Sequence, residues 1–103
     1  MQRDELLKRV KSSLQQAFGD RLRGVILYGS EARGTAEPDS DIDLLVLLEG
    51  PVTWDDSKKS IHVLYPLVLE SGRPIHTVEV DPAEYEAQEW PLYRMVRKEG
   101  ILA

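Results

Sequence analysis

The chain contains 103 residues, 42% of them hydrophobic, which is enough for one compact domain spanning residues 1–103 and little more. Its formal net charge of −5 disfavours direct nucleic-acid binding, because affinity for a phosphate backbone comes from clustered lysine and arginine. The absence of cysteine excludes disulfides, thiolate metal sites and cysteine nucleophiles. No apolar run has the length of a membrane span, and residues 1–10 lack the apolar core of a secretory signal. We therefore expect a cytoplasmic protein without a membrane partner.

The first predicted elements are an amphipathic helix and a buried strand. Between residues 4 and 18, apolar side chains recur at helical spacing, at Leu6, Leu7, Val10, Leu14, Ala17 and Phe18. Asp4 and Glu5 suit the N-terminal end of this helix, and Gly19 suits its C-terminal end. Residues 24–28 are a short apolar run between two glycines and predict a strand.

This strand ends at Gly29-Ser30, which leads into residues 30–33, a candidate first turn of a short helix. A glycine at this place lets backbone N–H groups approach a phosphate without a Cβ in the way, and Ser30 adds a hydroxyl donor. The free N–H groups and the dipole of a helix start favour the same anion. A Gly-Ser dipeptide is also an ordinary turn, so on its own it does not identify a phosphate site.

A pair of aspartates, Asp41 and Asp43, opens the next apolar run, residues 41–48. Because side chains alternate along a strand, both carboxylates point to one face, and the other face is lined by Ile42, Leu44, Val46 and Leu48. Two like charges at the start of an apolar strand are costly, and a bound Mg²⁺ removes that conflict. The alternatives are carboxylates in solvent, ion pairs with Arg33 and Arg73, or an aspartyl-phosphate site, for which no lysine and hydroxyl pattern is evident.

The second half of the chain predicts a long helix, a third strand and two shorter helices. The long helix covers residues 53–71, with Thr53 and Asp56 close to a capping box and with Pro66 expected to kink or split it. Its aromatic residues Trp54 and Tyr65 are expected to pack in the core or cover the helix rather than stack on bases. Residues 75–80 predict the strand, and the shorter helices begin after Asp81 and at Pro91.

Two polar residues of the predicted strand compete for a place beside the aspartates. Glu79 belongs to one alternating set of this strand, and His76 belongs to the other. Only one of them can therefore point towards Asp41 and Asp43, and the sequence does not decide which.

The order of these motifs resembles the minimal nucleotidyltransferase group of the DNA polymerase beta superfamily. The resemblance rests on Gly29-Ser30, ten further residues, and then Asp41-x-Asp43 at the start of an apolar strand, with Ala32-Arg33-Gly34 between them. The segment from Pro91 to Ala103 is also similar to the C-terminal part of such proteins. The resemblance implies an α+β fold, in which a small mixed sheet is flanked by helices.

The resemblance also assigns roles to the motif residues. Gly29 and Ser30 would hold the β and γ phosphates of ATP, Arg33 would contact phosphate or pack beside it, and Asp41 and Asp43 would hold Mg²⁺, with two ions expected once nucleotide is bound. Active members carry a third carboxylate early in the third strand, where this chain has His76, and Glu79 is the other candidate for that catalytic role. Glu31 stands where an arginine usually follows Gly-Ser.

The resemblance further implies transfer of AMP from ATP to a protein partner, with this chain as the antitoxin of a HEPN-type toxin and a toxin tyrosine as acceptor. The unassigned third carboxylate leaves a second hypothesis open, a catalytically weakened nucleotide-binding domain that neutralises its HEPN partner by binding alone. A homo- or hetero-oligomer is compatible with both hypotheses, because about 100 residues leave no room for a separate acceptor-binding domain.

Overall fold

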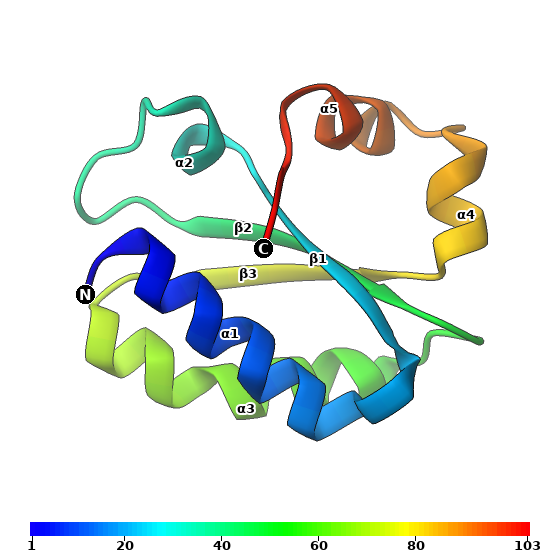
Figure 1. Cartoon of the computed structure of the whole chain (residues 1–103), viewed down its shortest axis with the longest axis horizontal. Helices are drawn as coiled ribbons and strands as arrows, with labels where there is room; N and C mark the ends of the chain where they lie inside the picture. The colour runs from blue at the N-terminus through cyan, green and yellow to red at the C-terminus, as the bar shows by residue number, and fades with distance from the viewer.

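The computed structural model describes all 103 residues and shows a four-stranded mixed sheet with helices on both faces (Figure 1). The helices are α1 (Arg3–Phe18), α2 (Ser30–Arg33), α3 (Trp54–Ser71), α4 (Pro82–Ala87) and α5 (Pro91–Glu99). The strands are β1 (Leu22–Tyr28), β2 (Ile42–Leu48), β3 (Ile75–Val80) and β4 (Ile101–Leu102), and the 3-10 helix η1 (Gly19–Arg21) joins α1 to β1. This arrangement confirms the expected α+β architecture.

The sheet has the strand order β3-β2-β1-β4, in which β1 runs antiparallel to both of its neighbours and β2 runs parallel to β3. A parallel pair requires a long crossover connection, and α3 supplies it. The end of β1 and the starts of β2 and β3 consequently meet at one end of the sheet. At that end Tyr28, Asp43 and His76 lie opposite one another in a row across the three strands.

One face of the sheet is covered by α1 and α3, which lie side by side in Figure 1. The predicted apolar set of β2, Ile42 to Leu48 at alternate positions, is fully buried here. It packs against Leu6, Val10 and Leu14 of α1 and against Leu64 and Leu67 of α3. Each such side chain contributes about 1.5–3 kcal/mol on burial, so this layer is the main source of stability.

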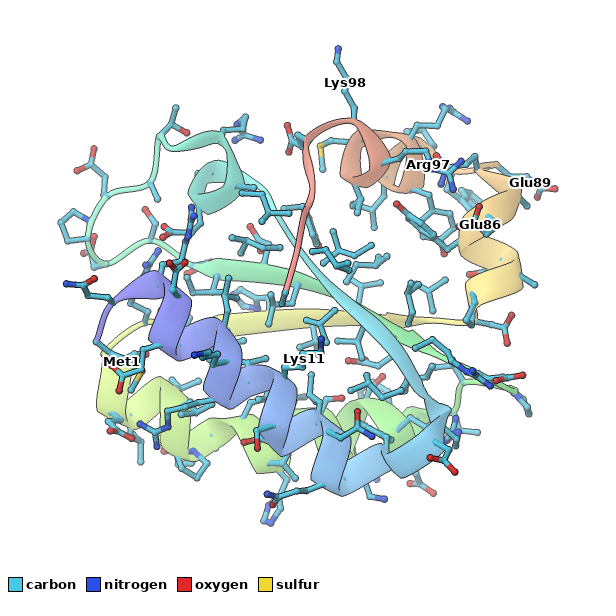
Figure 2. All side chains as sticks on the ribbon, in the orientation of Figure 1. Met1, Lys11, Glu86, Glu89, Arg97 and Lys98 are labelled. Carbon is cyan, nitrogen blue, oxygen red and sulfur yellow. The ribbon has the colours of Figure 1, made fainter.

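The other face is covered at one end by α4 and α5, which bury a smaller cluster. Its members come from three strands and both helices: Tyr28, Leu45, Val80, Tyr85, Tyr93 and Val96. The rings of Tyr85 and Tyr93 meet edge to face at 5.9 Å between centroids. Figure 2 shows Arg97 of α5 and Glu86 of α4 side by side, and their guanidinium and carboxylate atoms are 2.5 Å apart. These contacts fix α5 and therefore the segment that follows it.

Helix α3 departs from two sequence-based expectations. It runs without interruption through Pro66, because that residue lies on the exposed side, where the carbonyl left without an N–H partner can face water. Trp54 and Tyr65 are not core residues, since 71% and 56% of their surfaces are exposed. The predicted capping box of Thr53 and Asp56 is present. No helix in the molecule combines the length and apolar character needed to cross a bilayer.

The C-terminal strand β4 was not expected from the sequence, because two residues carry no periodic pattern. Ile101 and Leu102 pair with Leu27 and Ile26 of β1, and the Ala103 N–H donates to the Val25 carbonyl at 2.9 Å. The turn into β4 depends on Gly100, because a Cβ there would collide with the Val96 carbonyl and the Ile26 side chain. The end of α5 is therefore held close to the end of β1.

Candidate active site

The turn from β1 into α2 brings the backbone of Gly29 against a carboxylate of β2. Gly29 has φ +78°, and a Cβ at this residue would lie only 2.5 Å from Asp43 Oδ2. Only glycine fits both the backbone angle and the space. The turn is closed by hydrogen bonds from the Arg33 N–H to the Gly29 carbonyl and from the Thr35 N–H to the Ser30 carbonyl. The predicted short helix at residues 30–33 is confirmed as one turn.

Asp41 and Asp43 stand at the start of β2 beside this turn. Asp41 precedes the strand and has a half-exposed side chain, whereas Asp43 lies within the strand and is partly buried. Burial raises the pKa of Asp43, as does the nearby negative charge of Asp41, while His76 and Arg33 act in the opposite direction. Tyr28, opposite Asp43, has its pKa raised by burial and by the Asp43 charge. The site thus contains a carboxylate whose negative charge is poorly compensated by the protein itself.

The structure brings His76, and not Glu79, to the aspartates. His76 is in register with Asp43, and its Nε2 lies 3.0 Å from Asp41 Oδ2. Glu79 is in register with Val46, whose side chain belongs to the core beneath α1 and α3. Glu79 therefore points to the same face as Val46, which is the face opposite to that of Asp41 and Asp43. There its Oε1 accepts a hydrogen bond from the Ser57 hydroxyl at 2.8 Å. Glu79 therefore does not join the aspartates, because an odd change of strand register would be needed to turn it over.

Arg33 lies at the Gly-Ser turn, and its guanidinium is engaged by a residue that the sequence analysis missed. Arg33 Nη1 donates to Glu99 Oε1 at 2.9 Å, and the Gly29 N–H donates to the same oxygen at 3.3 Å. Glu99 is the last residue of α5, 70 positions away from Gly29. No local pattern marks it, because the contact depends on the pairing of β4 with β1.

Glu31, found where the resemblance leads one to expect an arginine, has a structural partner. It receives a hydrogen bond from Arg73 Nη2 at 2.9 Å, and both side chains are largely buried. Arg73 Nε also donates to the Ser40 carbonyl, next to Asp41. A positive charge is thus supplied from the turn before β3, and the ion pair ties α2 to the start of β2 and to that turn.

The donor set suits a metal ion that arrives with a nucleotide rather than a resident one. No three His, Cys, Asp or Glu side chains converge on a point that could hold an ion. Mg²⁺ commonly takes only one or two protein carboxylates and fills its other positions with water and substrate phosphates. Asp43, whose charge is left partly uncompensated, and the neighbouring Asp41 fit that mode of binding.

The site lies on the open surface of the molecule. None of the four cavities is lined by Gly29, Asp41, Asp43 or His76. The largest, about 430 Å³, lies along the outer side of α3 between Lys58 and Pro66. An open sheet end can hold phosphates and metal while leaving the rest of a ligand accessible to a second molecule.

Comparison with known proteins identifies the family of this chain. The sequence model of the nucleotidyltransferase domain matches residues 7–103. "Putative protein adenylyltransferase MJ0604" of Methanocaldococcus jannaschii is 31% identical over 101 residues, which cover 97% of this chain and 96% of that protein. "Putative protein adenylyltransferase MJ1305" of the same organism is 37% identical over 83 residues, 79% of this chain and 54% of the relative. The match thus spans about half the length of MJ1305.

Solved structures show the same fold. One described as "Structure of putative minimal nucleotidyltransferase" superimposes with a TM-score of 0.64 at 29% identity, covering 98% of this chain and 95% of the other. Another, "Crystal structure of the toxin-antitoxin with AMP-PNP", gives a TM-score of 0.65 at 19% identity over 92% of this chain and 70% of the other. The chain therefore belongs to the nucleotidyltransferase domain family and has the polymerase-beta-like fold of a minimal nucleotidyltransferase.

Proposed function

We propose that the protein is a Mg²⁺-dependent nucleotidyltransferase that moves AMP from ATP to a protein partner. The observation that carries this proposal is the contact between Gly29 and Asp43, which brings the Gly-Ser turn and the aspartate pair to one end of the sheet. Both of the relatives named above are called protein adenylyltransferases, which supports AMP as the group transferred.

In this proposal, each motif residue handles one part of the nucleotide. Gly29 allows the phosphates close to the backbone, the Ser30 hydroxyl donates a hydrogen bond to them, and Arg33 offsets their charge. Asp41 and Asp43 hold the Mg²⁺ that accompanies the nucleotide, with two ions expected in the complete complex. Bound Mg²⁺ neutralises charge that develops on the phosphates during transfer.

The reaction is an in-line substitution at the α-phosphorus. The acceptor oxygen forms a bond to that phosphorus, the bond from phosphorus to the bridging oxygen of the β-phosphate breaks, and pyrophosphate leaves. A tyrosine hydroxyl of the partner is the proposed acceptor, and its proton passes to solvent as the new bond forms. The protein contributes mainly by fixing the phosphates and the metal in place.

We also propose that the partner is a toxin of the HEPN type and that this chain is its cytoplasmic antitoxin, within a domain spanning residues 1–103. The structural likeness to a toxin–antitoxin complex supports this setting. The open site supports it as well, because a tyrosine of another protein can reach an α-phosphate held at the surface.

One observation favours a second function. His76, rather than a carboxylate, stands in register with Asp43. The site therefore offers one fewer negatively charged oxygen ligand than is expected for active members of the minimal nucleotidyltransferase group. A weakened site of this kind could still bind nucleotide and neutralise the partner by association alone.

A transfer assay separates the two functions. Wild-type protein, ATP labelled at the α-phosphate, Mg²⁺ and the cognate partner should yield labelled partner, and the Asp41→Asn, Asp43→Asn double variant should yield none. If wild type labels nothing while the double variant still binds the partner and suppresses its toxicity, neutralisation by binding replaces the enzymatic proposal. A double variant that binds but fails to suppress toxicity supports transfer.

A further inference from the structure

The carboxylate of Glu99 already accepts hydrogen bonds from Gly29 and Arg33, two of the residues assigned above to nucleotide phosphate. Glu99 Oε1 accepts hydrogen bonds from the Gly29 N–H at 3.3 Å and from Arg33 Nη1 at 2.9 Å. The Glu99 side chain is only 21% exposed, so it lies over the turn rather than in open solvent. An N–H and a guanidinium that converge on one oxygen are a small anion site, and a carboxylate fills it.

We propose that Glu99 is an internal competitor of the triphosphate and thereby sets the nucleotide affinity of the site. A phosphate oxygen and the Glu99 carboxylate cannot share the Gly29 N–H and Arg33, because both are anions and the donors are few. Phosphate binding therefore requires Glu99 to leave. This inference rests on the proposed function, since it takes Gly29 and Arg33 as phosphate-binding groups.

The movement required is a rotation of the Glu99 side chain rather than a displacement of its backbone. On one side, α5 is fixed by the buried residues Tyr93 and Val96. On the other side, Gly100 packs against Ile26 without room for a Cβ, and β4 is paired with β1. The carboxylate consequently remains tethered next to the site and returns when the phosphate departs. We expect it to favour release of pyrophosphate for the same reason.

The opposite role for the same contact is that Glu99 holds Arg33 ready for phosphate. The two roles predict effects of opposite sign when the carboxylate is neutralised. Competition predicts tighter triphosphate binding by both variants, because Glu99→Ala frees the donors and Glu99→Gln leaves only a neutral acceptor, which a phosphate displaces more easily than a carboxylate. Positioning predicts weaker binding, because Arg33 loses its partner.

Glu89 provides a matched control for the removal of one negative charge. Figure 2 shows it pointing away from the molecule beyond α4, and its side chain makes no hydrogen bond or ion pair. Glu89→Gln therefore changes the net charge as Glu99→Gln does, without touching the Gly-Ser turn. Any general gain in anion affinity from the altered charge appears in both variants.

The test is calorimetric titration of the whole protein with inorganic tripolyphosphate and, separately, with ATP and Mg²⁺ at one ionic strength. Competition predicts that Glu99→Gln and Glu99→Ala bind tripolyphosphate about three- to tenfold more tightly than wild type, and that Glu89→Gln stays within about twofold. Binding by the Glu99 variants where wild type binds nothing supports competition most strongly. Circular dichroism checks that the variants are folded. If one of the two Glu99 variants does not fold, the other still tests the proposal.

Equal affinity in wild type and both Glu99 variants overturns the competition, as does weaker binding, which assigns Glu99 to positioning Arg33. Absence of triphosphate binding in all the proteins overturns it too and removes nucleotide from the proposed function. Normal or enhanced triphosphate binding without any AMP transfer counts against the proposed reaction alone. The two proposals therefore fail in distinguishable ways.

Discussion

Asp43 and His76 are paired residues of the parallel strands β2 and β3, and their side chains lie on the same face of the sheet. Imidazole prefers transition metals to Mg²⁺, which takes oxygen ligands, so His76 is a poor substitute for a carboxylate beside Asp41 and Asp43. This relationship gives the most direct way to change the chemistry of the site without altering the fold.

His76→Asp should increase Mg²⁺-dependent AMP transfer by roughly tenfold or more, because it adds an oxygen ligand to the aspartate pair. The initial rate of labelling of the cognate partner measures the effect. His62→Asp, on the exposed side of α3, is the matched control and should leave the rate unchanged. A rate for His76→Asp at or below that of wild type would show that the imidazole itself is needed.

Asp43→Asn should stabilise the protein while abolishing Mg²⁺-nucleotide binding. Burial raises the pKa of Asp43 in the folded state, so its ionised form disfavours folding above that pKa, and this penalty disappears as the pH falls through it. Removing the charge should raise the free energy of unfolding at pH 7 by something on the order of 0.5 kcal/mol. Urea denaturation at pH 7 measures it. A loss of stability would mean that the carboxylate supports the fold.

Gly29→Ala should destabilise the protein by roughly 1–3 kcal/mol, because of the positive φ with an extended ψ and the collision with Asp43. Gly19→Ala is a close control, because Gly19 has a similar backbone, with φ +57° and ψ −133° against φ +78° and ψ −156° at Gly29, but no atom within 4 Å of the place that a Cβ would take. The difference between the two free energies of unfolding isolates the contact with Asp43. Similar values for both variants would contradict the tight approach of the turn to β2.

The stability of the protein at acidic pH should depend on Asp56. Hydrogen bonds from Arg21 and from Thr53 hold the pKa of Asp56 down to about 2. Because the unfolded carboxyl titrates near 4, this stabilisation is fully present above about pH 4 and is lost as the pH falls from about 4 to about 2. Asp56→Asn should therefore lower the free energy of unfolding by roughly 1–2 kcal/mol at pH 7. It should also make the free energy of unfolding less dependent on pH between about pH 2 and about pH 4. Thermal unfolding between pH 2 and pH 7 provides the measurement.

The sequence contained enough information for those elements whose signals are local. The capping box at Thr53, the alternation of residues 42–48 and the proline after Asp81 each act within a few residues, and each prediction is confirmed. The failed expectations concern which side of an element faces the core. Helix α3 buries Ser60 and Leu67 and exposes Trp54, because its orientation is set by α1 and the sheet.

The candidate site divides in the same way. The Gly-Ser turn and the aspartate pair were predictable because each is a short motif at the end of a strand. The choice between His76 and Glu79 was not, since it depends on the register of β3 against β2, which is a property of two strands. The contact of Glu99 with Arg33 was missed because the two residues are 66 positions apart in the sequence. The contact of Arg73 with Glu31 was missed for the same reason, since it joins residues 42 positions apart.

The parallel pairing of β2 with β3 also has a consequence for the order of folding. Gly29, Asp43 and His76 come together only after the α3 crossover has closed, and such long-range pairing forms slowly. The complete site, with His76 beside the aspartates, is therefore absent from chains in which β3 has not yet paired with β2. Nucleotide should slow unfolding without speeding the formation of the sheet, a difference that stopped-flow circular dichroism, followed in both directions, can measure.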